Sequence, residues 1–516
     1  MDEGKGDLMN KLKKLPIGIQ TFNKVREGNY LYIDKTEIAL DIIENNSYVF
    51  LSRPRRFGKS LFLDTLHNIF EAKKGLFEGL YIYDKYDWSK KYPVIKISFS
   101  GGIRSLESLS QELFHILNSN QKRLDISCEQ KESATICFAE LIEKAYLKYN
   151  QKVVILIDEY DKPILDNLTN IEQAKIIRDG IRDFYTKIKD SDQYIKFAFL
   201  TGVSKFSKAS IFSGLNNLTD ISLDKRYGNI CGYTQNDIET SFIDYLEGVD
   251  LAELKKWYNG YNFLGDKVYN PFDILLFINK DKTYNNYWFE TGTPTFLINL
   301  IKQNRYFLPN FKDIELDETL TNSFDIENLR LETIMFQAGY LTIKEVKRKR
   351  NRFKYIMRFP NLEVKMSFFD YILNDLVDIV EKNRVGDNLW DSFEEADLEN
   401  LKETITKLFA SIAYNNFTNN YISSYEGFYA SVLYAYFMSL GVEVIAEDVT
   451  NKGRIDLSVK FDDFTYIFEF KVSDEDPLAQ IKEKKYYEKY SGEVYIIGIN
   501  FDKKSRSVKK FVWEKV

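Results

Sequence analysis

Short apolar runs alternate with segments of helical periodicity through the first 225 residues. The apolar runs, each long enough for one buried strand, are residues 48–51, 94–99, 153–158 and 197–201. The intervening segments, whose apolar residues recur every three or four positions, include residues 106–117, 138–148 and 171–188. Strands that alternate with helices predict an α/β domain built on a mostly parallel, doubly wound sheet.

The pattern turns to helices after residue 225. Thr234 is placed to cap a helix over residues 235–246, with Asp237 in capping-box position, so we expect a helical lid to begin here. Residues 326–369 then read as a helix, a strand, a basic turn and a second strand. This order is typical of the last helix and the hairpin of a winged helix.

The C-terminal residues predict a second α/β unit. The expected helices are residues 424–440 and 477–490, and the expected strands are residues 443–449, 454–461, 465–472 and 493–500. The order helix, three strands, helix, strand is similar to the core of restriction-endonuclease-like proteins. We therefore expect three domains, residues 1–225, 226–385 and 386–516.

Composition narrows the function classes. No apolar run in the 516 residues approaches the roughly 20 needed to cross a bilayer, and the N-terminus lacks the apolar core of a signal peptide. We therefore expect a cytoplasmic protein without a membrane partner. Three cysteines without metal-site spacing and only two histidines argue against a zinc site or a histidine base. The net charge of −6 means that any nucleic-acid binding must use a local basic patch, and a homo-oligomer stays open.

The turn after the first apolar run is interpreted as a phosphate-binding loop. Gly58, Lys59 and Ser60 end a GxxxxGK(S/T) pattern, although Arg53 stands in place of its first glycine. Gly58 lets the backbone close on phosphate, Lys59 reaches the β- and γ-phosphates, and Ser60 offers its hydroxyl to Mg²⁺. The alternative is an ordinary basic turn before a helix. Residues 1–46 are interpreted as a cover for the adenine side or as a packing arm.

Further residues of the expected ATP site surround this loop. Asp158 and Glu159 end the third apolar run as in a Walker B motif, where Asp158 would hold Mg²⁺ and Glu159 would polarise the attacking water. Thr201 ends the next strand, a place suited to a sensor of the γ-phosphate. The expected cofactor-binding residues also include Arg53, Arg55, Arg56 and Phe57. Arg55 or Arg56 either neutralises transition-state charge or pairs with acidic side chains on neighbouring helices.

Two charged residues stand on an otherwise apolar strand near the C-terminus. Glu469 and Lys471 share one face, since side chains alternate along a strand, and Asp456 lies beside them on the neighbouring strand. Asp456 and Glu469 can bind Mg²⁺ together with the Phe470 carbonyl. Glu426 would complete the ligand shell from the preceding helix, while Lys471 would orient or deprotonate a metal-bound water. The alternative is an exposed strand face with alternating charges, which the apolar neighbours disfavour.

A basic cluster marks the tip of the predicted hairpin. Six of the eight residues from 347 to 354 are basic, namely Lys347, Arg348, Lys349, Arg350, Arg352 and Lys354. Such a concentration of charge can grip the phosphates of nucleic acid despite the acidic chain, and the alternative is a solvated tip without a ligand.

Several motifs together resemble the bacterial AAA-ATPase-like proteins that carry a C-terminal PD-(D/E)XK nuclease domain. They are PIGIQTF (16–22), YIDKT (32–36), RPRRFGKS (53–60), IDEYDKPI (157–164), WYNGYNF (257–263), YNPF (269–272) and ETGTPTFL (290–297). In that family an arginine commonly replaces the first loop glycine. The resemblance implies a P-loop NTPase sheet with a helical or winged-helix lid, followed by a restriction-endonuclease-like α/β domain. Gln480 and Tyr486 resemble residues of related nucleases, although their spacing departs from QxxxY and leaves their roles open.

Three functions are compatible with these features. The first is an ATPase and Mg²⁺-dependent nuclease, with ATP and Mg²⁺ as cofactors and nucleic acid, DNA favoured, as the partner. The second is a nucleotide-dependent switch or scaffold whose nuclease fold binds nucleic acid or a partner without cleaving it. A small-molecule kinase would leave the C-terminal third without a role. The joint presence of Asp456, Glu469 and Lys471 favours the first function.

Overall fold

Two compact units make up the chain in its computed structural model. The described residues are 12–99, 101–206, 211, 215, 217–288, 297, 313–317, 326–327, 330–374, 377–412, 426–450, 453–502, 505 and 507–516. The first unit comprises Met1–Leu297 with Ile314–Asn361, and the second comprises Ile298–Asp313 with Leu362–Val516. None of the described helices is long and apolar enough to span a membrane.

A five-stranded sheet with the order β2-β3-β4-β1-β5 forms the centre of the first unit. Its strands are β1 (Tyr48–Ser52), β2 (Val94–Ser98), β3 (Val153–Asp158), β4 (Ile195–Gly202) and β5 (Thr219–Asp220). Every neighbouring pair is parallel, which confirms the predicted sheet. All side chains of β3 are buried, as expected of a strand that is covered on both faces.

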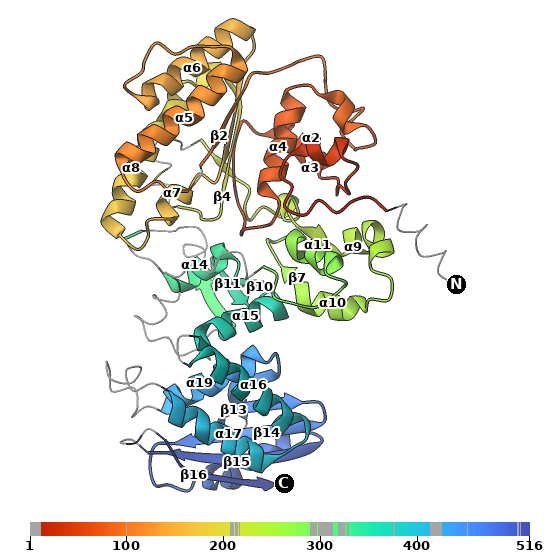
Figure 1. Cartoon of the computed structure of the whole chain (residues 1–516), viewed down its shortest axis with the longest axis vertical. Helices are drawn as coiled ribbons and strands as arrows, with labels where there is room; N and C mark the ends of the chain where they lie inside the picture. Colours follow the sequence, from red (N-terminus) through yellow and green to blue (C-terminus); the bar gives the residue numbers. More distant parts are fainter. Residues whose placement is uncertain are drawn as a thin grey trace. The chain divides into compact units, whose positions relative to one another are not determined.

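Helices cover both faces of this sheet (Figure 1). On one side α5, α6 and α8 pack together, and on the other lie α2, α3 and α4. The helices are α2 (Phe22–Glu27), α3 (Thr36–Asn45), α4 (Lys59–Phe70), α5 (Leu106–Leu124), α6 (Ala134–Tyr149), α7 (Lys162–Leu165) and α8 (Ile171–Asp190). Because β1 and β3 are parallel and only β4 separates them, the loops that follow them emerge at the same edge of the sheet.

Short helices surround a small antiparallel sheet in the next part of the first unit. These elements are β6 (Tyr233–Thr234), α9 (Gln235–Ser241), α10 (Leu251–Tyr258), β7 (Asn259–Tyr261), β8 (Val268–Tyr269) and α11 (Pro271–Asn279). The predicted capping box between Thr234 and Asp237 is confirmed. The α-helix ends at Ser241 instead of residue 246, because a 3-10 turn follows that buries Phe242 and Leu246 in the apolar core.

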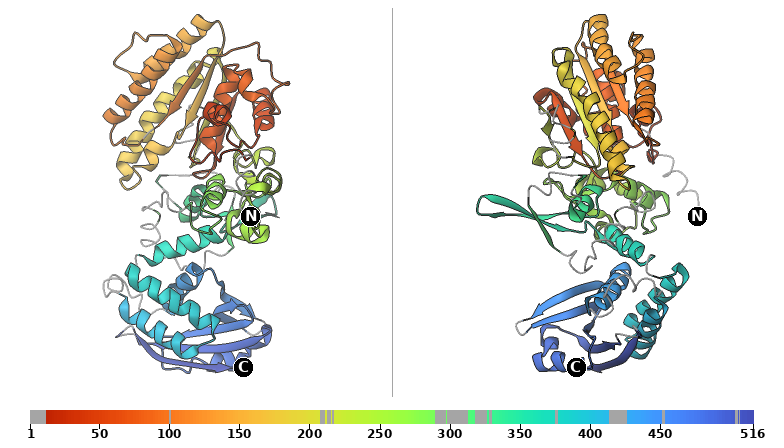
Figure 2. Two further views of the ribbon diagram at one scale, coloured as in Figure 1. Left: turned by 45° about the vertical axis from the view of Figure 1, so that its right-hand side comes forward. Right: turned by 90° about the vertical axis from the view of Figure 1, so that its left-hand side faces the viewer.

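A basic hairpin completes the described part of the first unit. Its elements are β9 (Ile314–Asp317), α14 (Leu331–Ala338), β10 (Thr342–Lys349) and β11 (Arg352–Arg358). The strands form an antiparallel sheet in the order β10-β11-β9, and the hairpin extends away from α14 (Figure 2). The hairpin agrees with the expected one, whereas its assignment to a winged helix stays a prediction. Of the motif at 290–297, all but Leu297 lies outside the described residues.

The second unit contains a mixed sheet with the order β12-β13-β14-β15-β16. Its strands are β12 (Glu443–Thr450), β13 (Gly453–Phe461), β14 (Phe464–Lys471), β15 (Glu493–Phe501) and β16 (Val508–Lys515). The β14–β15 pair is parallel and the other neighbours are antiparallel. The predicted three strands and the following parallel strand are all present, and β16 adds an edge that the sequence pattern had not indicated.

Helices of the second unit pack beside this sheet. They are α15 (Leu362–Leu373), α16 (Ile379–Glu394), α17 (Leu398–Ser411), α19 (Glu426–Ser439) and α20 (Ala479–Lys484). α20 is shorter than the predicted helix over residues 477–490, because Lys485 adopts a left-handed conformation (φ 47°) and a 3-10 turn follows it. The domain boundary proposed at residue 385 falls within α16, and the two compact units divide between Asn361 and Leu362.

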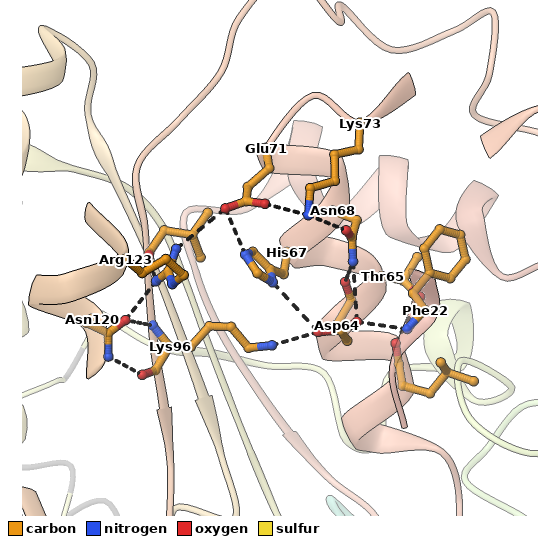
Figure 3. A network of polar contacts seen from close by, with 12 residues as sticks. Phe22, Asp64, Thr65, His67, Asn68, Glu71, Lys73, Lys96, Asn120 and Arg123 are labelled. Atoms are coloured by element: carbon orange, nitrogen blue, oxygen red, sulfur yellow. Dashed lines mark hydrogen bonds and ion pairs between the residues drawn. The ribbon is translucent and has the colours of Figure 1, made fainter. Parts of the chain in front are cut away.

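A charged network ties α4 to the sheet and to α5 (Figure 3). Asp64 Oδ1 lies 2.6 Å from Lys96 Nζ on β2, and Glu71 Oε1 lies 3.1 Å from His67 Nε2 and 3.5 Å from Arg123 on α5. His67 and neighbouring cations hold the pKa values of both carboxyl groups below their usual range, against the opposing effect of burial. The helix that begins at the phosphate-loop motif is thus fixed by paired charges.

We predict that Glu71→Gln lowers stability at neutral pH but not in acid. The pKa of Glu71 falls from 4.5 to about 2 in the folded protein, so its contribution is complete above pH 4.5 and is lost as the pH falls toward 2. The variant should melt roughly 2–4 °C below wild type at pH 7, the shift expected for about 1 kcal/mol, with a smaller gap at pH 3. Calorimetry measures both values. The exposed control Glu132→Gln should match wild type, and a gap that widens in acid would refute the network's role.

Candidate functional site

A cavity of about 350 Å³ lies where the loops after β1, β3 and β4 emerge from the sheet. The loop after β1 contributes residues 55–61 except Phe57, and the segment after β3 contributes Glu159, Asp161, Lys162 and Leu165. The remaining walls come from Pro16–Gln20 except Ile17, from Val203 and Tyr233, and from the start of α11. The structure therefore brings the two predicted nucleotide motifs to one cavity.

Lys59 and Ser60 begin α4 at this cavity. Gly58 precedes them with φ 91°, a left-handed conformation that favours glycine, although a Cβ there would meet no atom within 4 Å. The Lys59 ammonium donates to the carbonyls of Arg53 and Pro54, at 2.9 Å each. Burial lowers the pKa of Lys59, and the carboxylate of Asp158 opposes this effect. A helix N-terminus with a buried ammonium beside it is a site suited to phosphate.

The acidic end of β3 faces the same cavity. Glu159 lines the wall with φ 50°, a conformation that is uncommon for residues other than glycine. Burial, together with the charge of Asp158, raises the pKa of Glu159. Asp158 itself is buried, and its Oδ1 accepts a hydrogen bond of 3.0 Å from the Glu159 N–H. Asp161 was not predicted, yet it also lines the cavity, and burial raises its pKa to about 6.

Arg53 does not contribute to the cavity wall, although it was expected to bind the cofactor. Its buried guanidinium donates to the carbonyls of Ser222 at 2.7 Å and Tyr227 at 3.0 Å, and it lies 4.0 Å from the ring centre of Phe263. Burial lowers the pKa of Arg53 to about 10. These contacts give the side chain a structural position behind the phosphate loop.

Thr201 is likewise turned away from the cavity. Its hydroxyl donates to the Leu51 carbonyl at 3.0 Å, across the pairing of β4 with β1. The residue is fully buried and does not line the cavity. The structure therefore places Thr201 between two strands, and a sensor role would require this hydrogen bond to break.

Arg55 and Arg56 are both exposed and line the cavity. Arg56 has φ 68°, and its guanidinium lies 4.7 Å from the ring centre of Phe272 at the start of α11. Within the described ranges neither arginine forms an ion pair with a carboxylate, as the alternative interpretation had required. Phe57 is buried instead and packs edge-on against Tyr261 at 4.7 Å.

Several wall residues were not among the predicted site residues. Pro16, Gly18, Ile19 and Gln20 precede α2, and Tyr233 and Phe272 come from elements after the sheet. The signal for the latter was local, since Asn270 caps α11 through its side chain and Pro271 occupies the first turn. A capped helix start with proline marks a fixed backbone position, but only the fold shows that it faces the phosphate loop.

A second polar cluster lies in the second unit, at the ends of β13 and β14. Asp456 Oδ2 accepts a hydrogen bond of 2.8 Å from the Phe470 N–H, and Glu469 Oε1 lies 2.9 Å from Lys471 Nζ. Glu426 at the start of α19 accepts a hydrogen bond of 3.1 Å from the Val472 N–H. The four residues predicted from the (D/E)xK pattern, Glu426, Asp456, Glu469 and Lys471, are therefore neighbours.

The electrostatics of this cluster centre on Glu469, which is 1% exposed. Burial and the charge of Asp456 raise the pKa of Glu469 to about 7, although Lys471 opposes this shift. Burial lowers the pKa of Lys471, but Glu469 and the other acidic groups outweigh it and leave that pKa raised. Glu469 Oε2 is buried without a hydrogen-bond partner. A carboxylate with an unused oxygen beside a second carboxylate fits a divalent cation.

Gln480 on α20 belongs to the same cluster. Its Oε1 lies 3.4 Å from Lys471 Nζ, and its Nε2 lies 3.4 Å from the Tyr486 hydroxyl. The early end of α20 brings Tyr486 back toward Gln480 despite the long spacing. Among the described residues, however, no three acidic, histidine or cysteine side chains converge closely enough to form a ready metal cage.

The basic residues of the third predicted site all lie on the β10–β11 hairpin. Lys347 is opposite Lys354, Arg348 opposite Phe353, and Lys349 opposite Arg352. Arg350 occupies the turn with φ 57°. Lys347 pairs with Glu345 at 3.0 Å and Lys354 with Glu315 at 2.9 Å, so part of the charge is neutralised near the base of the hairpin.

The two α/β units define a P-loop NTPase domain and a nuclease-type domain. Residues 16–212 match the AAA-ATPase-like family, described as a predicted AAA-ATPase, and residues 424–511 match the PD-(D/E)XK nuclease superfamily. The chain is 48% identical over 512 residues to an "Uncharacterized protein in vnfD 5'region" of Azotobacter chroococcum mcd 1, covering 97% of this chain and 99% of that protein. The chain belongs to this family of AAA-ATPase-like proteins with a C-terminal PD-(D/E)XK nuclease domain, which confirms the resemblance.

We predict that Arg53→Gly, which restores the general loop pattern, destabilises the first unit. The substitution leaves the buried carbonyls of Ser222 and Tyr227 without their donor, and each such group costs roughly 1–3 kcal/mol. The free energy of unfolding should fall by at least about 2 kcal/mol, measured by denaturant titration of the transition that ATP shifts. Arg55→Gly, in the exposed wall, is the matched control and should keep wild-type stability. A stable Arg53→Gly protein with weakened ATP binding would instead make Arg53 a ligand.

Proposed function

We propose that the first unit binds and hydrolyses ATP and that the second cleaves phosphodiester bonds of nucleic acid, with DNA as the favoured substrate. The observation that carries the proposal is the meeting of Lys59, Ser60 and Glu159 at one cavity. The family supports a nucleotide-binding and a nuclease-type domain, and the specific activities are our inference. ATP occupancy would regulate engagement of nucleic acid by the rest of the chain.

Each polar group of the cavity has a role in this proposal. Lys59 would exchange its two carbonyl partners for the β- and γ-phosphates, while the first amides of α4 hold the phosphate oxygens. Glu159, whose pKa is raised, would orient the attacking water and accept its proton. Arg55 and Arg56 lie free of carboxylate partners in the described structure, so either can stabilise charge on the transferred phosphoryl group.

The base of the nucleotide would lie away from the phosphate loop. Pro16–Gln20, Tyr233 and Phe272 supply the apolar and aromatic part of the wall, which suits a purine ring. This placement favours the cover interpretation of the N-terminal segment over that of a packing arm. The same wall is built partly from α11, so nucleotide binding would join the sheet to the elements that follow it.

The second site is proposed to act on a phosphodiester bond. Lys471 donates to Glu469 and lies within 3.4 Å of Gln480, which holds the ammonium in position to orient a nucleophilic water. Asp456, Glu469 and Glu426 would hold Mg²⁺ here, and Ser60 and Asp158 would hold it in the first unit. Mg²⁺, when bound, supplies positive charge that stabilises the phosphate oxygens.

One observation favours a second candidate, a nucleotide-dependent switch or scaffold that binds without cleaving. Among the described residues the acidic side chains do not form a ready metal cage, and Asp456 and Glu426 both accept backbone hydrogen bonds. If those bonds persist in the complex, the nuclease fold serves only for binding. Cleavage assays with and without Mg²⁺ separate the two functions.

We predict that Lys59→Ala removes most ATP affinity, because the buried ammonium at the phosphate position is lost. Glu159→Gln should bind ATP as wild type does and slow hydrolysis by a factor of about 10² to 10⁴, since the proton acceptor is lost. Fluorescent-ATP titration and phosphate release measure the two effects. Tight ATP binding by the Lys59→Ala protein would remove the phosphate-loop assignment.

For the second unit we predict that Asp456→Ala and Glu469→Ala abolish cleavage of labelled DNA while the fold is kept. Lys471→Ala should slow cleavage by a factor of about 10² to 10⁴ and leave Mg²⁺ binding nearly unchanged, because its ammonium acts on the water. ATP turnover should survive all three changes. Cleavage that persists in either carboxylate variant, with circular dichroism showing a folded protein, would favour the scaffold.

A further inference from the structure

The β10–β11 hairpin presents two chemically different faces. Directly opposite residues in an antiparallel pair share a face, so Lys347, Lys349, Arg352 and Lys354 form one face and Val346, Arg348, Phe353 and Tyr355 form the other. The second face is apolar at its base, where Tyr355 and Met357 are buried. Toward the tip this apolar face becomes exposed.

Phe353 stands at the exposed end of that face. Its exposed fraction, 45%, is the largest among the phenylalanines in the part of the chain that the structure describes, and Val346 beside it is 40% exposed. Phe353 therefore contributes little to the core of the first unit. Its ring is presented to solvent on a strand that is otherwise basic.

Cations surround this ring. Arg348 is directly opposite Phe353, Arg352 is adjacent, and Arg350 lies in the turn. The acidic residues Glu345 and Glu315 neutralise only Lys347 and Lys354. Within the described ranges, no carboxylate pairs with Arg348, Lys349, Arg350 or Arg352, so the hairpin tip combines unneutralised charge with an exposed aromatic ring.

We propose that the hairpin tip binds unpaired nucleotides, with one base stacked on Phe353. The inference rests on the proposed nucleic-acid binding and extends it to single-stranded segments. An exposed aromatic ring can stack on any unpaired base, whereas the bases of an intact duplex are stacked on one another and present only their edges. Arg348 would cover the same base with its guanidinium plane, and Lys349 and Arg352 on the other face would contact the phosphates.

The test uses the full chain in EDTA, with a 20-nucleotide DNA strand containing 2-aminopurine and with the same sequence as a duplex. Phe353→Ala should weaken single-strand binding roughly 10-fold or more and remove the quenching of 2-aminopurine, while the salt dependence stays unchanged. Phe353→Trp should retain both binding and quenching. Tyr81→Ala is the matched control, since Tyr81 is 41% exposed and lies 3.8 Å from Lys85 Nζ, and it should have no effect.

A second variant separates this proposal from the one on which it rests. Replacing Arg348, Lys349, Arg350 and Arg352 with Ser should weaken binding of both DNA forms and reduce the salt slope by roughly 0.7 for each single-strand phosphate that no longer has a cation beside it. If this variant binds both DNA forms as wild type does, the hairpin is not a nucleic-acid site. If it weakens both but Phe353→Ala changes neither, or changes single strand and duplex equally, nucleic-acid binding stands and stacking is refuted.

Discussion

The nucleotide site of the first unit depends on the buried guanidinium of Arg53. The side chain joins the end of β1 to the segment after β5 through the carbonyls of Ser222 and Tyr227, and it stacks on Phe263. The carbonyl of the same residue accepts a hydrogen bond from the ammonium of Lys59. One residue thus supports the phosphate loop from behind with its side chain and holds the phosphate-binding lysine with its backbone.

Most of the fold could be predicted because buried strands and amphipathic helices have distinct sequence periods. VVILID in β3 has no polar residue before its final aspartate, and only a strand covered on both faces accepts such a run. β9 and β16 were missed because they are edge strands with mixed polarity, and their pairing depends on residues far away in sequence. The early end of α20 depends on the left-handed backbone of Lys485, a position where the sequence has no glycine to indicate it.

The candidate sites were predictable to the extent that strand ends determine them. Asp158, Glu159, Asp456 and Glu469 follow from strand register, whereas the direction of Arg53 and Thr201 does not. Both stand at strand ends near the cavity, yet carbonyl groups on neighbouring segments capture their side chains. Asp161 was missed for the opposite reason, since three acidic residues in IDEYD look alike until the backbone turns at Glu159. Local pattern locates a site, and tertiary hydrogen bonds decide which side chains enter it.

The contact of Gly339 with Pro54 has a mechanical consequence. A Cβ at Gly339 would lie 2.8 Å from Pro54 Cβ, so the end of α14 is seated directly on the phosphate loop. Gln337 on α14 accepts a hydrogen bond from the Lys205 N–H just after β4, and Thr342 at the start of β10 accepts one from Asn262. Close-packed contacts transmit displacement because they cannot be compressed. A shift of the phosphate loop must therefore move α14 or open a gap, and the hairpin is the long arm of a lever whose short arm rests on Pro54.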